Sequence, residues 1–501
     1  MLFSTPEYIF IFLPAVLFIY YVLTKYQMAA LSKFWLIAAS SYFYSYSSPR
    51  YLWLLYLSLT VNFLIGKRLT KDTYTGEEDE HLMRKILLIA GITGNVLVLI
   101  YYKYIDFLIF NLNQIVSGHY PFLKLALPLA ISFYTFQQIS FLVDCYFSKV
   151  KETSFVNYLI YVTFFPQLLS GPILRYWELA PQLEKKGNGS IDWSNISSGL
   201  FVFGIGLFKK VIVADSFALF ANAGFNTGNT LDFLQAWAAS LSYTFQIYYD
   251  FSGYTDMAIG AALMFNIRLP INFNSPYKAL NIQDFWHRWH ITLSRWLRDY
   301  LYIPFGGNRK GYSRTLLNLM LTFILAGIWH GAGWTFFVWG TLHGLAMVIH
   351  RLWKKLDICL PWIVSWFVTF LFINIAWVFF RAPNLSRATH ILHSMFSFNM
   401  AVPDLLVNLL HFHSYSDYTA VLALDGPVMP AIHAVFFIVI FPMVAFILPN
   451  TMQFIEFVPY NGKFIFKTNL KTAFFLATIL FISFLTFVGN VSKNNFIYFN
   501  F

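Results

Sequence analysis

The chain has 501 residues, of which 58% are hydrophobic and only 11% are charged. Soluble proteins carry about 25% charged residues, so this composition excludes an ordinary soluble globular protein. The net charge of +11 is spread over short loops between apolar runs. This placement is the positive-inside pattern of a membrane protein and does not form a basic face for nucleic acid. We therefore expect a lipid-embedded protein with no nucleic-acid partner.

Apolar runs of about 17 to 25 residues recur from end to end, which predicts an all-α, polytopic membrane protein. We expect one membrane domain over residues 1–501 with about 12 crossings. The first run lacks the pattern of a cleavable leader and is expected to stay as a span. The predicted crossings are 8–24, 34–45, 51–66, 85–102, 123–143, 199–216, 231–249, 316–330, 334–349, 362–380, 434–449 and 472–490.

The positions of lysine and arginine also predict the topology. Lys25 and Lys33 follow the first span and place the N-terminus on the outer face. The same parity puts the loop 381–432 and the tail 491–501 outside, and the basic loops in the cytoplasm.

Several segments do not have the pattern of simple spans. Two prolines and a glycine in 164–176 predict a re-entrant loop, which is tolerated where protein satisfies its backbone. Glycines and two aspartates interrupt the apolar run 248–260. Asp250 and Asp256 could orient a histidine or form buried pairs with arginine, and buried pairing is favoured. Residues 285–305 are predicted to form an amphipathic helix at the cytoplasmic interface.

The segment 285–311 reads FWHRWHITLSRWLRDYLYIPFGGNRKG and concentrates charge in an apolar chain. His287 and His290 are three residues apart and should share a helix face. The arginines of this segment are either headgroup anchors or the binding groups for an anionic phosphate donor. These arginines are Arg288, Arg295 and Arg298.

His330 lies deep in a predicted span, in the sequence LTFILAGIWHGAGW. The nearby glycines Gly327, Gly331 and Gly333 allow close backbone approach or a helix break. A neutral imidazole there could act as a general base, or it could be a packing histidine bonded to a carbonyl. Position alone leaves both interpretations open.

Other polar residues have structural interpretations. Gln137, Gln138 and Asp144 are expected to make interhelical hydrogen bonds, and His343 and His350, seven residues apart, to face the polar side of one helix. Cys145 and Cys359 are predicted to be free, buried thiols. Zinc sites with the histidine spacing of the outer loop usually include a cysteine or carboxylate ligand as well, and scattered surface histidines are the favoured interpretation, so we predict no metal. The histidines of this loop are His390, His393, His411 and His413.

Motifs along nearly the whole chain resemble the membrane-bound O-acyltransferase family, in its bacterial branch of alginate and peptidoglycan O-acetylation subunits. The teichoic-acid D-alanylation proteins are more distant. The motifs are FYTFQQISFLVD, FFPQLLSGPILRY, YYDFSGYTDMAIG, FWHRWHITLSRWLRDYLYIPFGGNRKG and IWHGAGWTFFVWG. This chain has FWHRWH where alginate-type members often have FWRRWH, so His287 is not assumed to be catalytic.

The resemblance implies a multi-pass protein of the bacterial inner membrane, built around a transmembrane tunnel. It assigns catalysis to His330, with His290 as its companion. It also implies a cytoplasmic acyl thioester donor such as acetyl-CoA, no bound cofactor, and a glycan acceptor reached through an extracytoplasmic SGNH-type partner. The terminal FIYFNF resembles a hexapeptide whose tyrosine is proposed to accept the acyl group. Tyr498, by position alone an aromatic belt anchor, thereby becomes a candidate acyl carrier.

We therefore expect an O-acyltransferase that passes an acetyl group across the membrane. One alternative is a transporter or flippase of an acylated carrier, although no internal repeat typical of transporters is evident. The other alternative is a scaffold without catalysis within a polysaccharide export complex.

Overall fold

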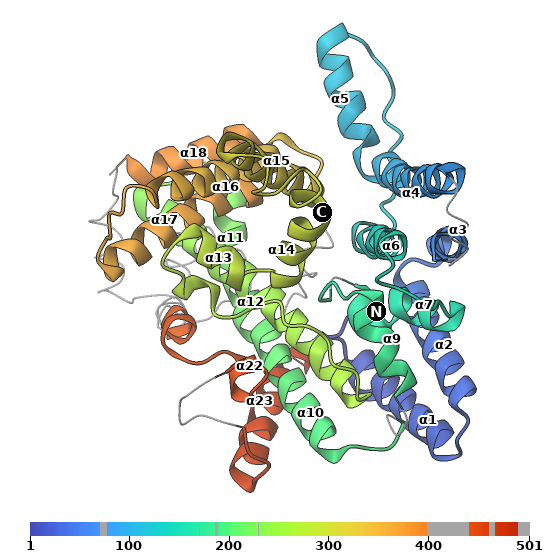
Figure 1. Ribbon diagram of the computed structural model, residues 1–501. Helices are drawn as coiled ribbons and strands as arrows, with labels where there is room; N and C mark the ends of the chain where they lie inside the picture. Colours follow the sequence, from blue (N-terminus) through green and yellow to red (C-terminus); the bar gives the residue numbers. More distant parts are fainter. Residues whose placement is uncertain are drawn as a thin grey trace. The chain divides into compact units, whose positions relative to one another are not determined.

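The computed structural model describes residues 1–70, 78–169, 171–185, 189–228, 230–397, 440–459 and 466–488. Over these residues the chain is helical and has no strand (Figure 1), as the sequence predicts. Two compact units are present. The first unit combines Met1–Phe203 with Met257–Ile271, and the second combines Gly204–Asp256 with Asn272–Phe501.

The first unit is built around one helix that is buried on nearly all sides, α6 (Ile131–Tyr146). The neighbouring helix α3 (Leu52–Leu69) contacts its polar face: Ser58 and Asn62 donate to Oε1 of Gln138 at 2.8 and 2.9 Å. This confirms the predicted interhelical hydrogen bonding for Gln138. The other helices of the unit are α1 (Leu13–Lys25), α2 (Ala29–Ser47), α3 (Leu52–Leu69), α4 (Glu78–Leu99), α5 (Ile105–Val116), α7 (Phe155–Thr163), α8 (Phe165–Leu168) and α9 (Tyr176–Glu184).

The proline-rich segment 164–176 contains only the short helix α8, followed by irregular backbone that is buried in the first unit. Gly171 makes the turn possible, because a Cβ there would lie 2.4 Å from Cα of Gln167. A buried, irregular backbone fits the predicted re-entrant loop, whose place in the membrane stays a prediction.

The second unit carries most of the candidate site residues. Helices α10 and α12 each start in one unit and end in the other. The helices are α10 (Trp193–Phe208), η4 (Lys209–Ala214), α11 (Asp215–Asn226), α12 (Phe233–Met264), α13 (Ile282–Arg288), α14 (Ile291–Leu297), η6 (Arg298–Tyr302), α15 (Tyr312–His330), α16 (Trp334–Trp353), α17 (Trp362–Arg381), α18 (Leu385–Phe396), 440–447, α22 (Thr451–Phe454) and α23 (Leu470–Val488).

Helices α15 and α16 form a closely packed hairpin (Figure 1). A Cβ at Gly327 would lie 2.4 Å from the carbonyl oxygen of Phe336, and one at Gly340 would lie 2.5 Å from that of Phe323. Small residues let the two backbones approach in this way, as in many membrane helix pairs. The predicted close approach at Gly327 is confirmed.

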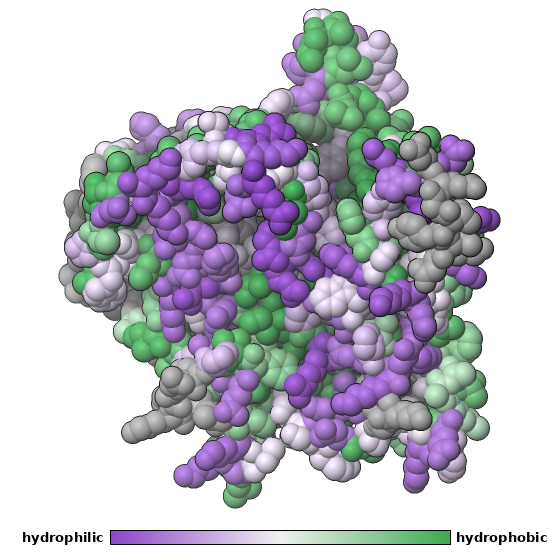
Figure 2. All heavy atoms as spheres, in the orientation of Figure 1, coloured by the Kyte–Doolittle hydropathy of each residue, from purple (hydrophilic) through white to green (hydrophobic). Residues whose placement is uncertain are grey.

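Six helical stretches of the described chain are long and apolar enough to cross a membrane. Their surfaces expose large apolar side chains, and Figure 2 shows such side chains over α5, where Ile115 is 80% exposed. The protein is therefore a multi-pass membrane protein, and the total of about 12 crossings stays a prediction. The six stretches are Glu7–Lys25, Pro49–Leu69, Asp79–Val116, Trp193–Asn226, Tyr312–His330 and Trp362–Arg381.

Residues 248–260 lie inside the continuous helix α12, since glycines in a buried helix need not interrupt it. Two sequence expectations are wrong. The expected amphipathic helix at 285–305 is broken between α13 and α14, where His290 has a φ of 43°. Cys145 is a buried free thiol as predicted, but Cys359 is exposed.

Candidate active site

His290 occupies the break between α13 and α14 and is completely buried. The break is held by backbone pairing with the preceding loop. The amide of Asn274 donates to the carbonyl of Arg288 at 2.9 Å, and that of Ile291 donates to the carbonyl of Asn272 at 3.0 Å. Tertiary pairing thus supports a left-handed backbone conformation that a histidine rarely adopts.

The side chain of Asn272 selects the tautomer of His290. Its Oδ1 accepts from the amide of Thr292 at 3.2 Å and lies 3.4 Å from Nδ1 of His290. Because a backbone amide can only donate, this atom is an acceptor and Nδ1 must carry the proton. Burial lowers the pKa of His290 to about 3, so the ring is neutral near pH 7. Its Nε2 therefore holds a lone pair.

His330 is the last residue of α15 and is 4% exposed. Aromatic rings surround it, with centroids 4.8 Å away for Trp329, 5.1 Å for Trp339 and 5.2 Å for Phe380. At Gly331 a Cβ would lie 2.2 Å from the ring of Phe336, so a larger residue would have to displace that ring. The turn fixes His330 in a water-poor, aromatic setting.

Ring contacts connect the surroundings of the two histidines. Trp289, next to His290, lies 5.0 Å from Trp377, which lies 5.8 Å from Trp339. Trp339 in turn contacts His330. A layer of three buried indoles therefore extends from one histidine to the other within the second unit.

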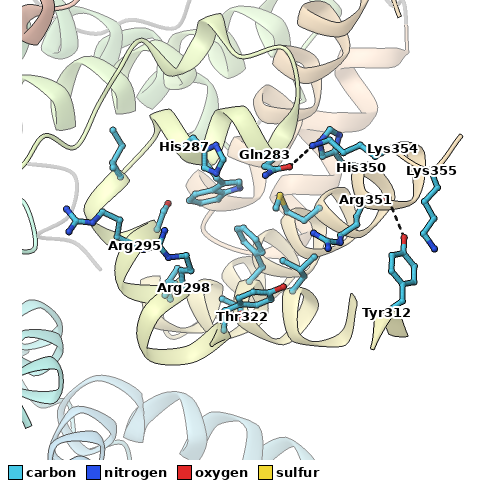
Figure 3. A pocket seen from close by; sticks show the side chains of 18 residues that line it. Gln283, His287, Arg295, Arg298, Tyr312, Thr322, His350, Arg351, Lys354 and Lys355 are labelled. Carbon is cyan, nitrogen blue, oxygen red and sulfur yellow. Dashed lines mark hydrogen bonds between the residues drawn. The ribbon is translucent and has the colours of Figure 1, made fainter. Parts of the chain in front are cut away.

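A cavity of about 800 Å³ opens beside α13 and α14 (Figure 3). This volume is within the usual range of ligand pockets, about 300–1,000 Å³. Five lysine and arginine side chains line it, and no carboxylate does. We call it the basic pocket; its lining residues are Gln283, Trp286, His287, Ile291, Ser294, Arg295, Leu297, Arg298, Tyr302, Tyr312, Leu319, Thr322, Phe323, Met347, His350, Arg351, Lys354 and Lys355.

Neutral groups hold two of the lysines in place. Lys354 donates to Oε1 of Gln283 at 3.1 Å, and the ammonium of Lys355 lies 3.3 Å from the ring centroid of Tyr312 (Figure 3). A ring quadrupole attracts a cation without cancelling its charge. The pocket can therefore offer positive charge to an anionic ligand.

The structure separates the three arginines named from the sequence. Arg295 and Arg298 line the basic pocket, and Arg298 is also paired with Asp299 at 2.7 Å. Arg288 is paired with Asp284 at 2.8 Å and does not line the pocket. Sequence reasoning missed Arg351, Lys354 and Lys355, because it assigned that basic cluster to membrane topology alone.

The histidines of this region fall into two groups, those that line the basic pocket and those that are completely buried. His287 is exposed and lines the basic pocket, so the expectation that it shares a face with buried His290 is wrong. His350 also lines the pocket, but His343 is completely buried and does not face a polar side. The first error arises because the helix is interrupted at 289–290, and the second because α16 is packed against other helices on the side that carries His343.

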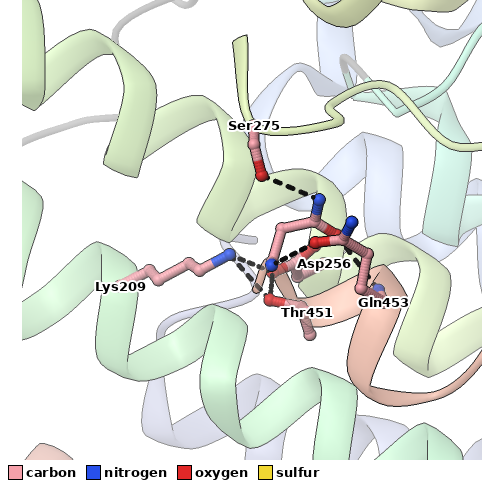
Figure 4. Close-up of polar contacts among 6 residues, drawn as sticks. Lys209, Asp256, Ser275, Thr451 and Gln453 are labelled. Carbon is pink, nitrogen blue, oxygen red and sulfur yellow. Dashed lines mark hydrogen bonds and ion pairs between the residues drawn. The ribbon is translucent and has the colours of Figure 1, made fainter. Parts of the chain in front are cut away.

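Two lysines of η4 pair with aspartates of α11 and α12. Lys210 lies 2.7 Å from both Asp215 and Asp250, and Lys209 lies 2.7 Å from Asp256 (Figure 4). Buried pairing was predicted correctly, but the partner is lysine rather than arginine. We call these five residues the lysine–aspartate network.

The segment 440–459 ties this network to the loop that holds His290. The hydroxyl of Thr451 donates to Asp256 at 2.7 Å. Beside it, the side-chain amide of Asn450 donates to Oδ1 of Asn274 at 2.9 Å and to the hydroxyl of Ser275 at 3.0 Å. These hydrogen bonds brace the loop from which Asn272 contacts His290.

Three sequence predictions fall partly or wholly outside the described residues. Tyr498 lies there, as do His411 and His413 and most of the outer loop. His390 and His393 lie on α18. Within the described ranges no group of histidine, cysteine and carboxylate residues could hold a metal ion.

Comparisons with known proteins agree with the resemblance of the motifs. A sequence model of the membrane-bound O-acyltransferase family matches residues 41–387. The chain is 42% identical to a peptidoglycan O-acetyltransferase of Helicobacter pylori, with 100% of this chain and 98% of the relative covered. It is 39% identical to a probable alginate O-acetylase of Pseudomonas aeruginosa, with 79% and 75% covered.

A more distant relative has a different acyl group in its name. The teichoic acid D-alanyltransferase of Bacillus subtilis is 29% identical over 49% of this chain and 65% of its own length. The family match covers more than half of the chain and includes His290, His330 and the basic pocket. The chain therefore belongs to the membrane-bound O-acyltransferase family and is a multi-pass membrane O-acyltransferase.

Proposed function

We propose that this enzyme transfers an acetyl group from a phosphorylated thioester in the cytoplasm for O-acetylation of a cell-surface polysaccharide. The observation that carries this proposal is the basic pocket, whose lining has five cationic side chains, aromatic rings and no carboxylate. Arg298 is paired with Asp299 outside this lining. The names of the relatives support the acetyl group and the polymeric acceptor, because two are acetylases of peptidoglycan or alginate.

The pocket suits a donor that has both phosphates and a less polar acyl arm. Arg295, Arg298 and Arg351 can form charge-assisted hydrogen bonds with phosphate oxygens, and Trp286 and Phe323 line the pocket with apolar surface. Acetyl-CoA has this chemistry and is the donor we propose. The positive-inside rule places the basic residues that follow α16 on the cytoplasmic face, where this donor is made.

His330 is the proposed general base. It removes the proton from the accepting hydroxyl, whose oxygen attacks the thioester carbonyl carbon. A C–O bond forms, the C–S bond breaks, and the imidazolium returns the proton to the departing thiolate. The apolar rings around His330 keep competing water away from the thioester.

His290 has a positioning role in this proposal. Because Asn272 keeps the proton on Nδ1, the unprotonated Nε2 can accept a hydrogen bond but cannot donate one to a carbonyl. This tautomer favours the orientation of a hydroxyl or amide donor group over direct polarisation of the thioester.

We propose Tyr498 as the hydroxyl that accepts the acetyl group before it reaches the glycan. The terminal FIYFNF and the predicted outer position of the tail support this step. An extracytoplasmic SGNH-type partner would then move the acetyl group from the tyrosine ester to the polysaccharide.

The test compares His330→Ala with His393→Ala, a matched control on the exposed face of α18. Both strains are brought to equal enzyme levels, and ester-linked acetate is measured on peptidoglycan and on extracted surface polysaccharide. Loss of a general base should lower acetylation by about 10²- to 10⁴-fold. Undiminished acetylation in His330→Ala would contradict the proposed chemistry. Mass spectrometry of the C-terminal peptide tests Tyr498 separately, through an acetyl adduct that His330→Ala should abolish.

A further inference from the structure

His343 is a completely buried histidine that the proposed chemistry does not use. It lies on α16 among aromatic rings, with centroids 5.1 Å away for Trp286, 4.7 Å for Trp339 and 5.4 Å for Phe372. A leucine or phenylalanine would fill such a site without burying polar atoms. The presence of an imidazole here needs a reason.

The hydrogen bond from Trp286 supplies that reason. The indole Nε1 of Trp286 donates to Nδ1 of His343 at 3.3 Å. An indole N–H can only donate, so Nδ1 is unprotonated and the proton of the neutral ring is on Nε2. Among the described residues this Nε2 has no hydrogen-bond partner. The imidazole of His343 thus leaves its own Nε2–H without a hydrogen bond to any described residue, which costs free energy, while its Nδ1 satisfies and orients the indole N–H of Trp286.

Trp286 and Trp339 connect His343 with both parts of the proposed site. Trp286 is 4% exposed and lines the basic pocket. Trp339, four residues before His343 on the same helix, lies against His330 with ring centroids 5.1 Å apart and an interplanar angle of 87°. Side chains four residues apart on a helix lie on one face. The imidazole of His343 therefore contacts both Trp286, which lines the pocket, and Trp339, which packs against His330.

We propose that His343 is a positioning residue that fixes the Trp286 indole as the inner wall of the donor pocket and sets its place relative to His330. This proposal rests on the proposed function, in which the basic pocket binds the thioester donor. His343 does not touch the reacting atoms in this scheme. It acts through Trp286, whose orientation decides where the acyl arm of the donor lies.

The test uses three variants that separate the hydrogen bond from packing. His343→Leu removes the acceptor, Trp286→Phe removes the donor but keeps an aromatic ring, and His343→Asn keeps an acceptor near the position of Nδ1. Transfer from radiolabelled acetyl-CoA is measured in inside-out membrane vesicles, with the enzyme quantified by immunoblot. Donor KM and kcat are determined for each variant and for the double variant with Trp286→Phe and His343→Leu.

We expect His343→Leu and Trp286→Phe each to raise the donor KM about fivefold, the effect of one neutral hydrogen bond. The double variant should be no worse than the poorer single variant, because both changes remove the same interaction. His343→Asn should recover most of the wild-type KM. Additive effects in the double variant would overturn the proposal. So would an unchanged KM in Trp286→Phe, even if His343→Leu failed to fold.

A fourth variant separates this proposal from the proposed function. Arg351→Ala removes a pocket cation that is remote from the Trp286 hydrogen bond. If Arg351→Ala leaves the donor KM unchanged, the basic pocket is not the donor site, and this part of the proposed function is wrong. If Arg351→Ala raises KM but the Trp286 and His343 variants do not, only the positioning role is wrong. Reduced enzyme levels with normal kcat and KM per molecule would likewise leave His343 a purely structural residue.

Discussion

The second unit contains two clusters of positive charge, one paired with carboxylates in the protein interior and the other lining an open cavity. In the lysine–aspartate network, the side chains of Lys209 and Lys210 are only 13% and 4% exposed, and each lies 2.7 Å from a carboxylate. In the basic pocket, five cations line a cavity whose lining residues include no carboxylate, and one of the five, Arg298, is paired with Asp299 at 2.7 Å. Charge inside an apolar core must be neutralised, because an isolated buried ion costs several kcal/mol. Charge at an open cavity can stay available for a ligand.

Exposure explains how the pocket tolerates its charge. The side chain of Arg298 is 60% exposed, whereas that of Lys210 is 4% exposed. Water hydrates the pocket cations when no ligand is bound, so their mutual repulsion is screened. The comparison predicts that changes in the network lower stability, and that changes in the pocket alter donor binding with little effect on stability.

Lys210→Met should have the largest effect on stability. It leaves the buried Asp250 and the 14% exposed Asp215 without the lysine, and removal of one partner of a buried pair typically costs about 3–5 kcal/mol. Thermal unfolding of the purified enzyme in detergent should show a markedly lower Tm. The matched control adds Asp215→Asn and Asp250→Asn to Lys210→Met, which removes the uncompensated charges and should recover much of the loss. A wild-type Tm for Lys210→Met alone would contradict the structural assignment.

Arg295→Ala combined with Arg351→Ala should have the largest effect on the donor. Each change removes a potential charge-assisted hydrogen bond of about 1.5–3 kcal/mol, so the donor KM should rise about 100-fold or more. The Tm should stay near that of the wild type, because neither arginine neutralises a buried carboxylate of the network. The KM of the wild-type enzyme should also rise with salt, and a salt-independent KM would argue against phosphate binding.

The two clusters also show what the sequence can predict. Apolar run length indicates the helices, and aspartates in an apolar run indicate buried pairing, since both follow from local composition. The partners of Asp250 and Asp256 lie about 40 residues away on η4, and no local spacing identifies them. The break at Trp289 and His290 has no glycine or proline to signal it, because backbone pairing with residues 272–274 imposes it. Helical spacing grouped His343 with His350, although only tertiary packing decides their burial.

Thr451→Val tests the edge of the network, where the effect should be smaller. The hydroxyl of Thr451 lies 2.7 Å from both Lys209 and Asp256. Valine keeps the shape but removes the hydroxyl, while the ion pair between Lys209 and Asp256 persists. We expect a loss of about 1 kcal/mol in the free energy of unfolding, measured as a modest fall in Tm. A fall as large as that of Lys210→Met would mean that the hydroxyl, rather than the ion pair, holds this part of the network together.

Arg288→Ala should have the smallest effect of all and sharpens the comparison. Arg288 is as basic as the pocket arginines and lies in the same segment, but it pairs with Asp284 one turn away on α13. Both side chains are partly exposed, at 33% and 28%, so the pair should contribute only about 0.3–0.5 kcal/mol to stability. The donor KM of Arg288→Ala should equal that of the wild type in the vesicle assay. If it rises as much as in Arg295→Ala, the charge of the whole segment attracts the donor, and the arrangement of cations within the basic pocket is not what binds it.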